Sequence, residues 1–105
     1  MHVSMNNEIL SILSLAMKGG KAVSGEFQVM EAVKKKKACL VILAEDASDN
    51  TKKLFSDKAG FRDIPVITLG TKEILGRAIG KKDRSNVAIL DPGFTSLILK
   101  KSGKV

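Results

Sequence analysis

Short apolar segments alternate along this chain with longer segments whose apolar residues recur at three- and four-residue spacing. The segment Leu40–Leu43 contains only branched aliphatic residues, which is typical of a strand covered on both faces of a sheet. Helices that alternate with such strands pack on both sides of the sheet they form. The alternation therefore predicts a three-layer α/β/α sandwich with a four-stranded, mixed sheet.

Capping residues and glycines mark where the helices are expected to begin and end. The four predicted strands are residues 21–23, 40–43, 66–69 and 87–90. The apolar residues expected to face inward from the helices include Leu54, Ile74 and Leu97. Helix starts are expected at Asn6 or Asn7, at Ser24 or Gly25, at Ser48 or Asp49, at Thr71, and at Asp91-Pro92.

The whole chain, residues 1–105, is expected to be a single domain with a disordered start at residues 1–4. The longest apolar run, residues 38–44, is far shorter than the roughly 20 residues that cross a bilayer, so no membrane span is predicted. No export signal is recognised at the N-terminus. Cys39 is the only cysteine, which excludes an intrachain disulfide and favours a cytoplasmic location; we expect it in the core.

The chain has 18 Lys and Arg residues against 11 Asp and Glu residues, a formal net charge of +7. This excess favours polyanionic partners, RNA or DNA first, although a basic surface can also serve only to keep a small domain soluble. The most conspicuous run, residues 34–37, consists of four lysines. Stabilisation of a helix C-terminus explains this run best, and contact with nearby RNA is the alternative.

The residues that catalysis usually requires are scarce in this sequence. With one histidine, one cysteine and no tyrosine, neither a Ser-His nor a Cys-His pair can be built in the core, and zinc ligands are missing. Residues 76–82 resemble a phosphate-binding loop only faintly, and their glycines are better explained by close packing and a helix stop. Glu45 and Asp46 follow a buried strand, where helix capping is a better explanation than catalysis. We therefore predict no enzyme activity, no cofactor and no metal.

Several blocks of the sequence resemble, in order, the ribosomal protein family that binds kink-turn RNA. The similarity is greatest to the small bacterial members of the YlxQ type and covers nearly the whole chain. The blocks are KGGKAVSGE at residues 18–26, LVILAEDAS at 40–48, IPV at 64–66, LGRAIG at 75–80 and VAI at 87–89.

The resemblance implies an RNA site at the start of the second helix, beginning here at Gly25. The family motif continues with one variable residue, then Asn-Glu, two further residues and Lys, whereas this chain has Phe27, Gln28 and Glu31 at those three places. Gln28 keeps an acceptor for guanine amino groups without the charge of glutamate. Glu26 either replaces part of that contact or is favoured at the helix start by the dipole alone. Phe27 either stacks on an unpaired base or belongs to the core. Glu31 repels phosphate.

A second contact region implied by the resemblance is the loop at residues 81–86, together with Lys72. This loop is rich in basic residues, which suit contacts with phosphates better than stacking on bases. The RNA-binding residues implied by the resemblance are Lys21, Ser24, Gly25, Glu26, Phe27, Gln28, Lys72, Lys81, Lys82 and Arg84.

The expected function is non-catalytic binding of a kink-turn or a related G·A-containing RNA, ribosomal or in a messenger leader. The resemblance implies a monomer, possible ribosome association and no small-molecule substrate. One alternative is a protein-interaction or regulatory module of the same fold that binds RNA only non-specifically. A nucleotide-handling enzyme is the other alternative, which the missing catalytic groups disfavour.

Overall fold

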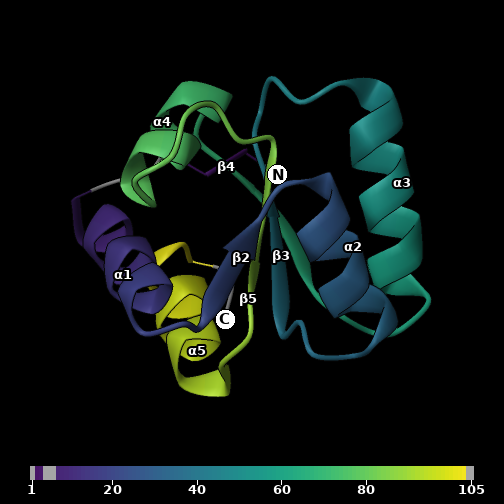
Figure 1. The fold of residues 1–105 in the computed structure, drawn as a ribbon, viewed down its shortest axis with the longest axis horizontal. Coiled ribbons are helices and arrows are strands. Elements are labelled where there is room, and N and C mark those ends of the chain that lie inside the picture. Colours follow the sequence, from purple (N-terminus) through teal and green to yellow (C-terminus); the bar gives the residue numbers. More distant parts are fainter. Residues whose placement is uncertain (1, 4–6, 104–105) are drawn as a thin grey trace.

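The computed structural model describes residues 2–3 and 7–103 of the chain. Helices and strands alternate throughout this part, as the sequence predicts (Figure 1). The helices are α1 (Asn7–Lys18), α2 (Glu26–Lys34), α3 (Asp49–Gly60), α4 (Lys72–Ala78) and α5 (Pro92–Lys101). The strands are β1 (His2–Val3), β2 (Ala22–Ser24), β3 (Leu40–Leu43), β4 (Val66–Leu69) and β5 (Asn86–Ile89).

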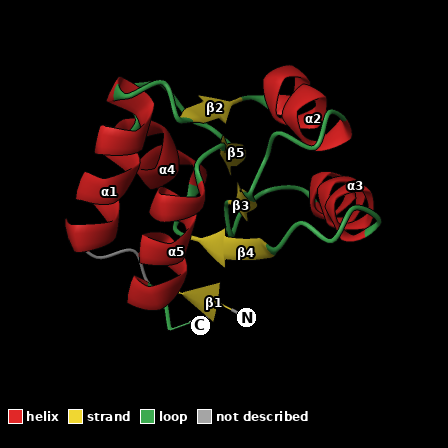
Figure 2. Ribbon diagram, turned by 90° about the horizontal axis from the view of Figure 1, so that it is seen from below, coloured by secondary structure: helices red, strands yellow, loops and turns green. Residues whose placement is uncertain are grey.

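The strands form one mixed sheet in the order β1-β4-β3-β5-β2. Strands β1, β4 and β3 are parallel, whereas β5 runs antiparallel to both β3 and β2. Helices α1, α4 and α5 cover one face of this sheet, and α2 and α3 cover the other (Figure 2). The predicted α/β/α sandwich with a mixed sheet is confirmed, and the short edge strand β1 is added to the four expected strands.

The N-terminal segment differs from the sequence-based expectation of a disordered start at residues 1–4. His2 and Val3 form β1 and pair with Thr68 and Leu69 of β4. Helix α1 begins at Asn7, and its expected cap, Asn6, lies outside the described residues.

The core consists of two apolar clusters, one on each face of the sheet. Leu40 and Ile42 of β3 belong to the cluster beneath α1, α4 and α5, whereas Val41 and Leu43 belong to the cluster beneath α2 and α3. Successive side chains of a strand point to opposite faces, so β3 contributes to both clusters and is buried throughout. The two clusters hold the five helices on the sheet. The loops that connect helices and strands lie at the two ends of the strands (Figure 1).

Three apolar helix residues that were expected to face inward are exposed instead. Leu54 is 43% exposed, Ile74 39% and Leu97 45%, so these predictions are wrong. The next residue in each helix, Phe55, Leu75 or Ile98, was also expected to face inward, and each of these is buried. Adjacent helical positions differ by about 100° around the axis, so only one of two neighbouring apolar residues can point directly into the core.

Two further sequence predictions are corrected at the ends of strands. Cys39 is only half-buried, because it lies just before β3 and not within it. Strand β5 begins at Asn86 and ends at Ile89, one residue earlier than expected. Asn86 is fully buried, although the sequence predicted it as the last residue of a charged loop.

Candidate functional site

The segments that contain most of the predicted site residues meet at one end of the strands, the edge of the sheet at which β3 and β4 end. We call this the upper edge: the start of α2, the turns after β3 and β4, and residues 81–85, all at the top of Figure 1. The Ala44 amide donates to the Ser85 carbonyl at 2.9 Å, and the Glu45 amide donates to the Gly70 carbonyl at 2.7 Å. These backbone hydrogen bonds tie the turn after β3 to both neighbouring segments.

The start of α2 presents backbone amides that have no partner among the described residues. Gly25 is the N-cap, with φ 91° and ψ 151°, and no side chain caps the helix. The first bond within the helix runs from the Val29 amide to the Gly25 carbonyl at 3.0 Å, which leaves the amides of residues 26–28 without a described acceptor. Unpaired amides and the positive end of the helix dipole make this a surface for anions and acceptor groups.

The space in front of this helix start is open. A Cβ added to Gly25 would meet no atom within 4 Å. Glu26, Phe27 and Gln28 are all exposed, and Phe27 reaches 79%. The interpretation of Phe27 as a core residue is therefore wrong. The helix start presents an aromatic ring, a carboxylate and an amide side chain beside its free N–H groups.

Glu26 faces the start of α3, a contact that the sequence analysis missed. The Thr51 hydroxyl lies 3.4 Å from Glu26 Oε1, and the Ser48 hydroxyl donates to Thr51 Oγ1 at 2.9 Å. Ser48 also accepts from the Thr51 amide at 3.1 Å, which confirms it as the predicted cap of α3. Residues 26 and 51 are 25 positions apart, so only the packing of α2 against α3 reveals that they meet.

Arg84 connects three segments at the upper edge. Its Nε donates to the Ser24 hydroxyl at 3.1 Å, and its Nη1 donates to the carbonyl of Asp83 at 2.9 Å. Its backbone amide donates to the Lys72 carbonyl at 3.0 Å. The structure therefore brings Ser24, Lys72 and Arg84 together beside Gly25. Arg84 is half-buried, and two hydrogen bonds hold its guanidinium group.

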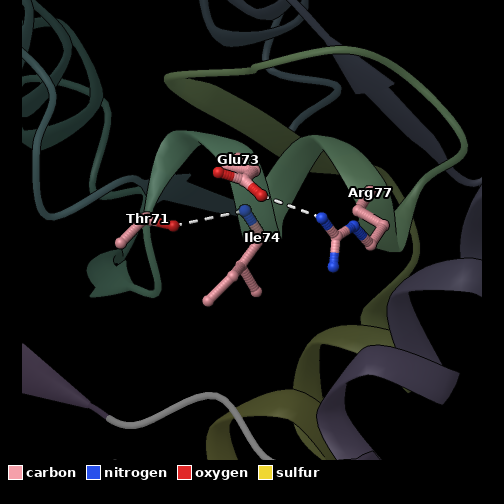
Figure 3. A network of polar contacts seen from close by, with 4 residues as sticks. All are labelled: Thr71, Glu73, Ile74 and Arg77. Carbon is pink, nitrogen blue, oxygen red and sulfur yellow. Dashed lines mark hydrogen bonds and ion pairs between the residues drawn. The ribbon is translucent and has the colours of Figure 1, made fainter.

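Asp46 fixes the start of α4. Its Oδ1 accepts from the Lys72 amide at 2.8 Å, which confirms helix capping as the role of this carboxylate. The capped helix is α4, whereas α3, which follows Asp46 in the sequence, is capped by Ser48. Thr71 completes the start of α4, because its Oγ1 accepts from the Ile74 amide at 3.2 Å (Figure 3).

Lys81 and Lys82 lie beside α4. Together with Glu73, Arg77 and Asp83 they line a shallow polar pocket. The Arg77 guanidinium forms an ion pair with the Glu73 carboxylate at 2.8 Å, one helical turn apart (Figure 3).

The basic loop rests directly on α4 because residue 76 is a glycine. A Cβ at Gly76 would overlap the backbone carbonyl of Lys82. Gly80 has φ 74° just after the end of α4, where the chain reverses into this loop. Both observations confirm that these glycines serve close packing and a helix stop.

Lys21 is not part of the upper edge. Strand β2 pairs Ala22 with Ile89 and Ser24 with Val87, so the residue before Ala22 lies at the opposite end of the strand from Gly25. The Lys21 carbonyl accepts from the Leu90 amide at 2.8 Å, which places this lysine beside the end of β5.

Asn86 is a buried polar residue next to the site. Its carbonyl accepts from the Gly25 amide at 3.3 Å, and its Nδ2 lies 3.3 Å from the Ser85 hydroxyl. Its Oδ1 has no hydrogen-bond partner among the described residues. Strand alternation from Ala88, which belongs to the cluster beneath α2 and α3, places the Asn86 side chain on that same face. Nothing in the sequence marks this residue except its position before an apolar strand.

Among residues 2–3 and 7–103, no group of three or more His, Cys, Asp or Glu side chains could hold a metal ion. No helix in this part of the chain is long and apolar enough to span a bilayer.

Residues 7–99 match the model of the ribosomal protein L7Ae/L30e/S12e/Gadd45 family. Two similar proteins are both named RNA-binding protein YlxQ. The one from Bacillus subtilis (strain 168) is 39% identical over 88% of this chain and 92% of its own length. The one from Enterococcus faecium is 33% identical over 90% of each chain.

Solved structures also share this fold. A protein of unknown function from Bacillus halodurans has a TM-score of 0.86 and 40% identity, covering 90% of this chain and 96% of its own. A Giardia lamblia 15.5kD RNA binding protein has a TM-score of 0.77 at 23% identity, covering 96% of this chain and 90% of its own, a likeness in fold alone.

Proposed function

Because the chain belongs to the ribosomal protein L7Ae/L30e/S12e/Gadd45 family, we propose that it is a non-catalytic, cytoplasmic RNA-binding protein. Its target is a kink-turn or a related structured RNA with G·A pairs, in ribosomal RNA or a messenger leader, and the protein acts as a ribosome-associated monomer. Two relatives more than 30% identical are named as RNA-binding proteins, which supports RNA as the partner.

The observation that carries this proposal is the open start of α2. The amides of residues 26–28 lack described acceptors, and Gly25 has no side chain that would hold RNA away from them. Phosphate oxygens and the acceptor atoms of bases suit such a surface, because the helix dipole adds positive potential.

The exposed side chains at this helix start are suited to contacts with bases. The Gln28 carbonyl can accept from guanine amino groups, and Phe27 can stack on an unpaired base, a contact worth about 1 to 3 kcal/mol. Glu26 can accept from a second amino group, although it shares its carboxylate with Thr51.

Lys72 and Arg84 lie on the same edge and can bind the RNA backbone, with Lys81 and Lys82 farther along α4. Basic side chains at these positions set the orientation of the RNA without reading its sequence. Glu31, which stands where the family has lysine, lies with its Oε2 3.8 Å from Lys35 Nζ. This ion pair offsets part of the repulsion between Glu31 and phosphate.

A second candidate function follows from an apolar groove between α2 and α3. Phe27, Met30, Leu54 and Phe55 line this groove, and a partner protein could cover the exposed Phe27 ring there. In that case the chain is a protein-interaction module that binds RNA only through its charge.

A binding titration distinguishes the two candidates. The protein is titrated with a kink-turn duplex and with the same duplex in which Watson-Crick pairs replace the G·A pairs, at several salt concentrations. Tighter binding of the kink-turn duplex at every salt concentration supports the proposal. Equal affinity for both duplexes would refute it and favour the second candidate, because backbone attraction alone does not distinguish them.

A further inference from the structure

We propose that the opposite edge of the sheet is a second binding surface for RNA backbone, so that one molecule can bridge two RNA segments. This inference rests on the proposed function, which identifies RNA as the polyanion. We call this surface the lower edge, at the bottom of Figure 1. Its basic residues are Lys18, Lys21, Lys34, Lys35, Lys36 and Lys37.

The topology brings these lysines to one place although they come from two separate stretches of sequence. The Lys21 carbonyl accepts from the Leu90 amide at 2.8 Å, and Leu90 lines one shallow groove together with Lys35 and Lys37. The same groove runs along α2 as far as Phe27 and Gln28. Lys18 ends α1, whose last turn is joined to this place by the bond from the Lys21 amide to the Ala16 carbonyl at 2.8 Å.

Little negative charge offsets the lower edge. All six lysines are exposed, and Lys35 is the one among them that forms an ion pair with a described residue, Glu31 at 3.8 Å. Two other carboxylates lie near this edge: Asp91, which accepts from the Phe94 amide at 2.9 Å as the cap of α5, and Asp63.

The upper edge, by contrast, has acidic side chains placed among its basic ones. Its acidic residues include Glu26, Asp46, Asp49, Glu73 and Asp83. The lower edge therefore has an excess of positive charge, whereas the charges of the upper edge largely cancel. A concentrated charge of one sign attracts a polyanion and makes its binding sensitive to salt.

The backbone of Lys36 is a second, independent observation. Lys36 has φ 57°, and it follows α2 at the position where the chain reverses. The Lys36 amide donates to the Val33 carbonyl at 3.0 Å, and the Lys37 amide donates to the Ala32 carbonyl at 2.8 Å. This is a Schellman motif, in which glycine is the favoured residue because it has no side chain to strain. Lysine in place of glycine weakens folding here, so a substitution by glycine can separate the effect of the charge on binding from its effect on stability.

Helix α2 separates the two surfaces. Its nine residues span about 13 Å at 1.5 Å per residue. RNA docked on the start of α2 and a second segment bound to the lysines would therefore contact opposite ends of this helix.

The substitution Lys36→Gly tests this inference, because it should affect folding and binding in opposite directions. It removes the strain and the charge together, so we expect a higher Tm and severalfold weaker binding of a plain A-form RNA duplex without G·A pairs. The dependence of log affinity on log salt should become less steep by about one. Preference for the kink-turn duplex should not change.

Asp63→Gly is the matched control. Asp63 has φ 58° after α3, and its amide donates to the Gly60 carbonyl at 3.1 Å, so glycine should raise the Tm there too. It removes a negative charge, so binding of the plain duplex should not weaken. The proposal would be overturned if Lys36→Gly bound the plain duplex as tightly as the wild type does. It would also be overturned if both variants lost the same amount of affinity for that duplex.

Bridging is tested with two RNAs at once. Wild-type protein saturated with kink-turn RNA should still bind a labelled plain duplex, and Lys36→Gly should bind it less well. Complete displacement of one RNA by the other would overturn bridging. Binding of a polyglutamate peptide but not of the duplex would overturn it in favour of an acidic protein partner. The two proposals can fail separately. If the G·A pairs make no difference to affinity but the protein still binds both RNAs at once, kink-turn recognition is wrong and this inference stands.

Discussion

Nε of Arg84 donates a hydrogen bond to the Ser24 hydroxyl at 3.1 Å, although 60 positions separate the two residues. Ser24 ends β2 and directly precedes Gly25, so this bond joins the loop before β5 to the start of α2. Arg84 therefore has a fixed place beside the amides of α2, with Nη2 free of any described partner. A side chain fixed in this way loses less conformational freedom when it binds phosphate.

Substitution of Ser24 by alanine tests this positioning. Ser24→Ala removes the acceptor of Arg84 Nε, so affinity for the kink-turn duplex should fall by about 1 kcal/mol. Thermal unfolding should change little, because the residue is only partly buried. Binding is measured for Ser24→Ala, Arg84→Gln and the double variant. The two losses should be less than additive, and full additivity would show that Ser24 does not act through Arg84.

Gln28 is expected to read bases. Gln28→Ala should reduce the preference for the kink-turn duplex over its Watson-Crick counterpart by about 1 to 3 kcal/mol, as loss of a base contact does. The preference is measured by titrating both duplexes at one salt concentration. An unchanged preference would contradict the assignment of base contact to this residue.

Lys82 is expected to contact only the backbone. Lys82→Ala should weaken both duplexes alike and reduce the salt slope by about one. The slope comes from the affinity at several salt concentrations, with Lys53→Ala on the exposed side of α3 as the control. A larger loss for one duplex than for the other would show that Lys82 takes part in recognition of the G·A pairs.

Gly25 is expected to be needed for folding as well as for access. At φ 91° and ψ 151° it lies in a region that other residues rarely adopt, so Gly25→Ala should lower the free energy of unfolding by about 1 to 3 kcal/mol. Urea denaturation provides the measurement. Gly60→Ala is the matched control, because Gly60 lies within α3 without a positive φ and alanine should stabilise it by about 0.4 to 1 kcal/mol.

Much of the fold follows from local patterns in the sequence. The branched run at Leu40–Leu43 predicts the buried strand β3, and Ser48, Thr71 and Asp91 predict the starts of three helices. These features depend on neighbours in sequence, so spacing alone reveals them. Which of two adjacent apolar residues faces the core depends on how the helix packs on the sheet. The sequence therefore could not show that Phe55 is buried and that Leu54 is exposed.

The candidate site could be predicted only in part for the same reason. The resemblance identified Ser24, Gly25, Lys72 and Arg84, which the structure brings together. The contact of Thr51 with Glu26 and the burial of Asn86 arise from the packing of α2 beside α3 and β5. Lys21 is separated from Gly25 because the extended strand β2 lies between them, a consequence of strand geometry that a family motif does not express.

The most direct test of RNA docking on α2 is the exchange rate of individual backbone amides, measured by NMR with and without kink-turn RNA. The amides of Glu26, Phe27 and Gln28 have no described acceptor in the free protein, so they should exchange quickly alone and much more slowly in the complex. Their resonances should also shift. If these amides keep their exchange rates and shifts when the RNA is bound, the start of α2 is not the RNA-binding surface.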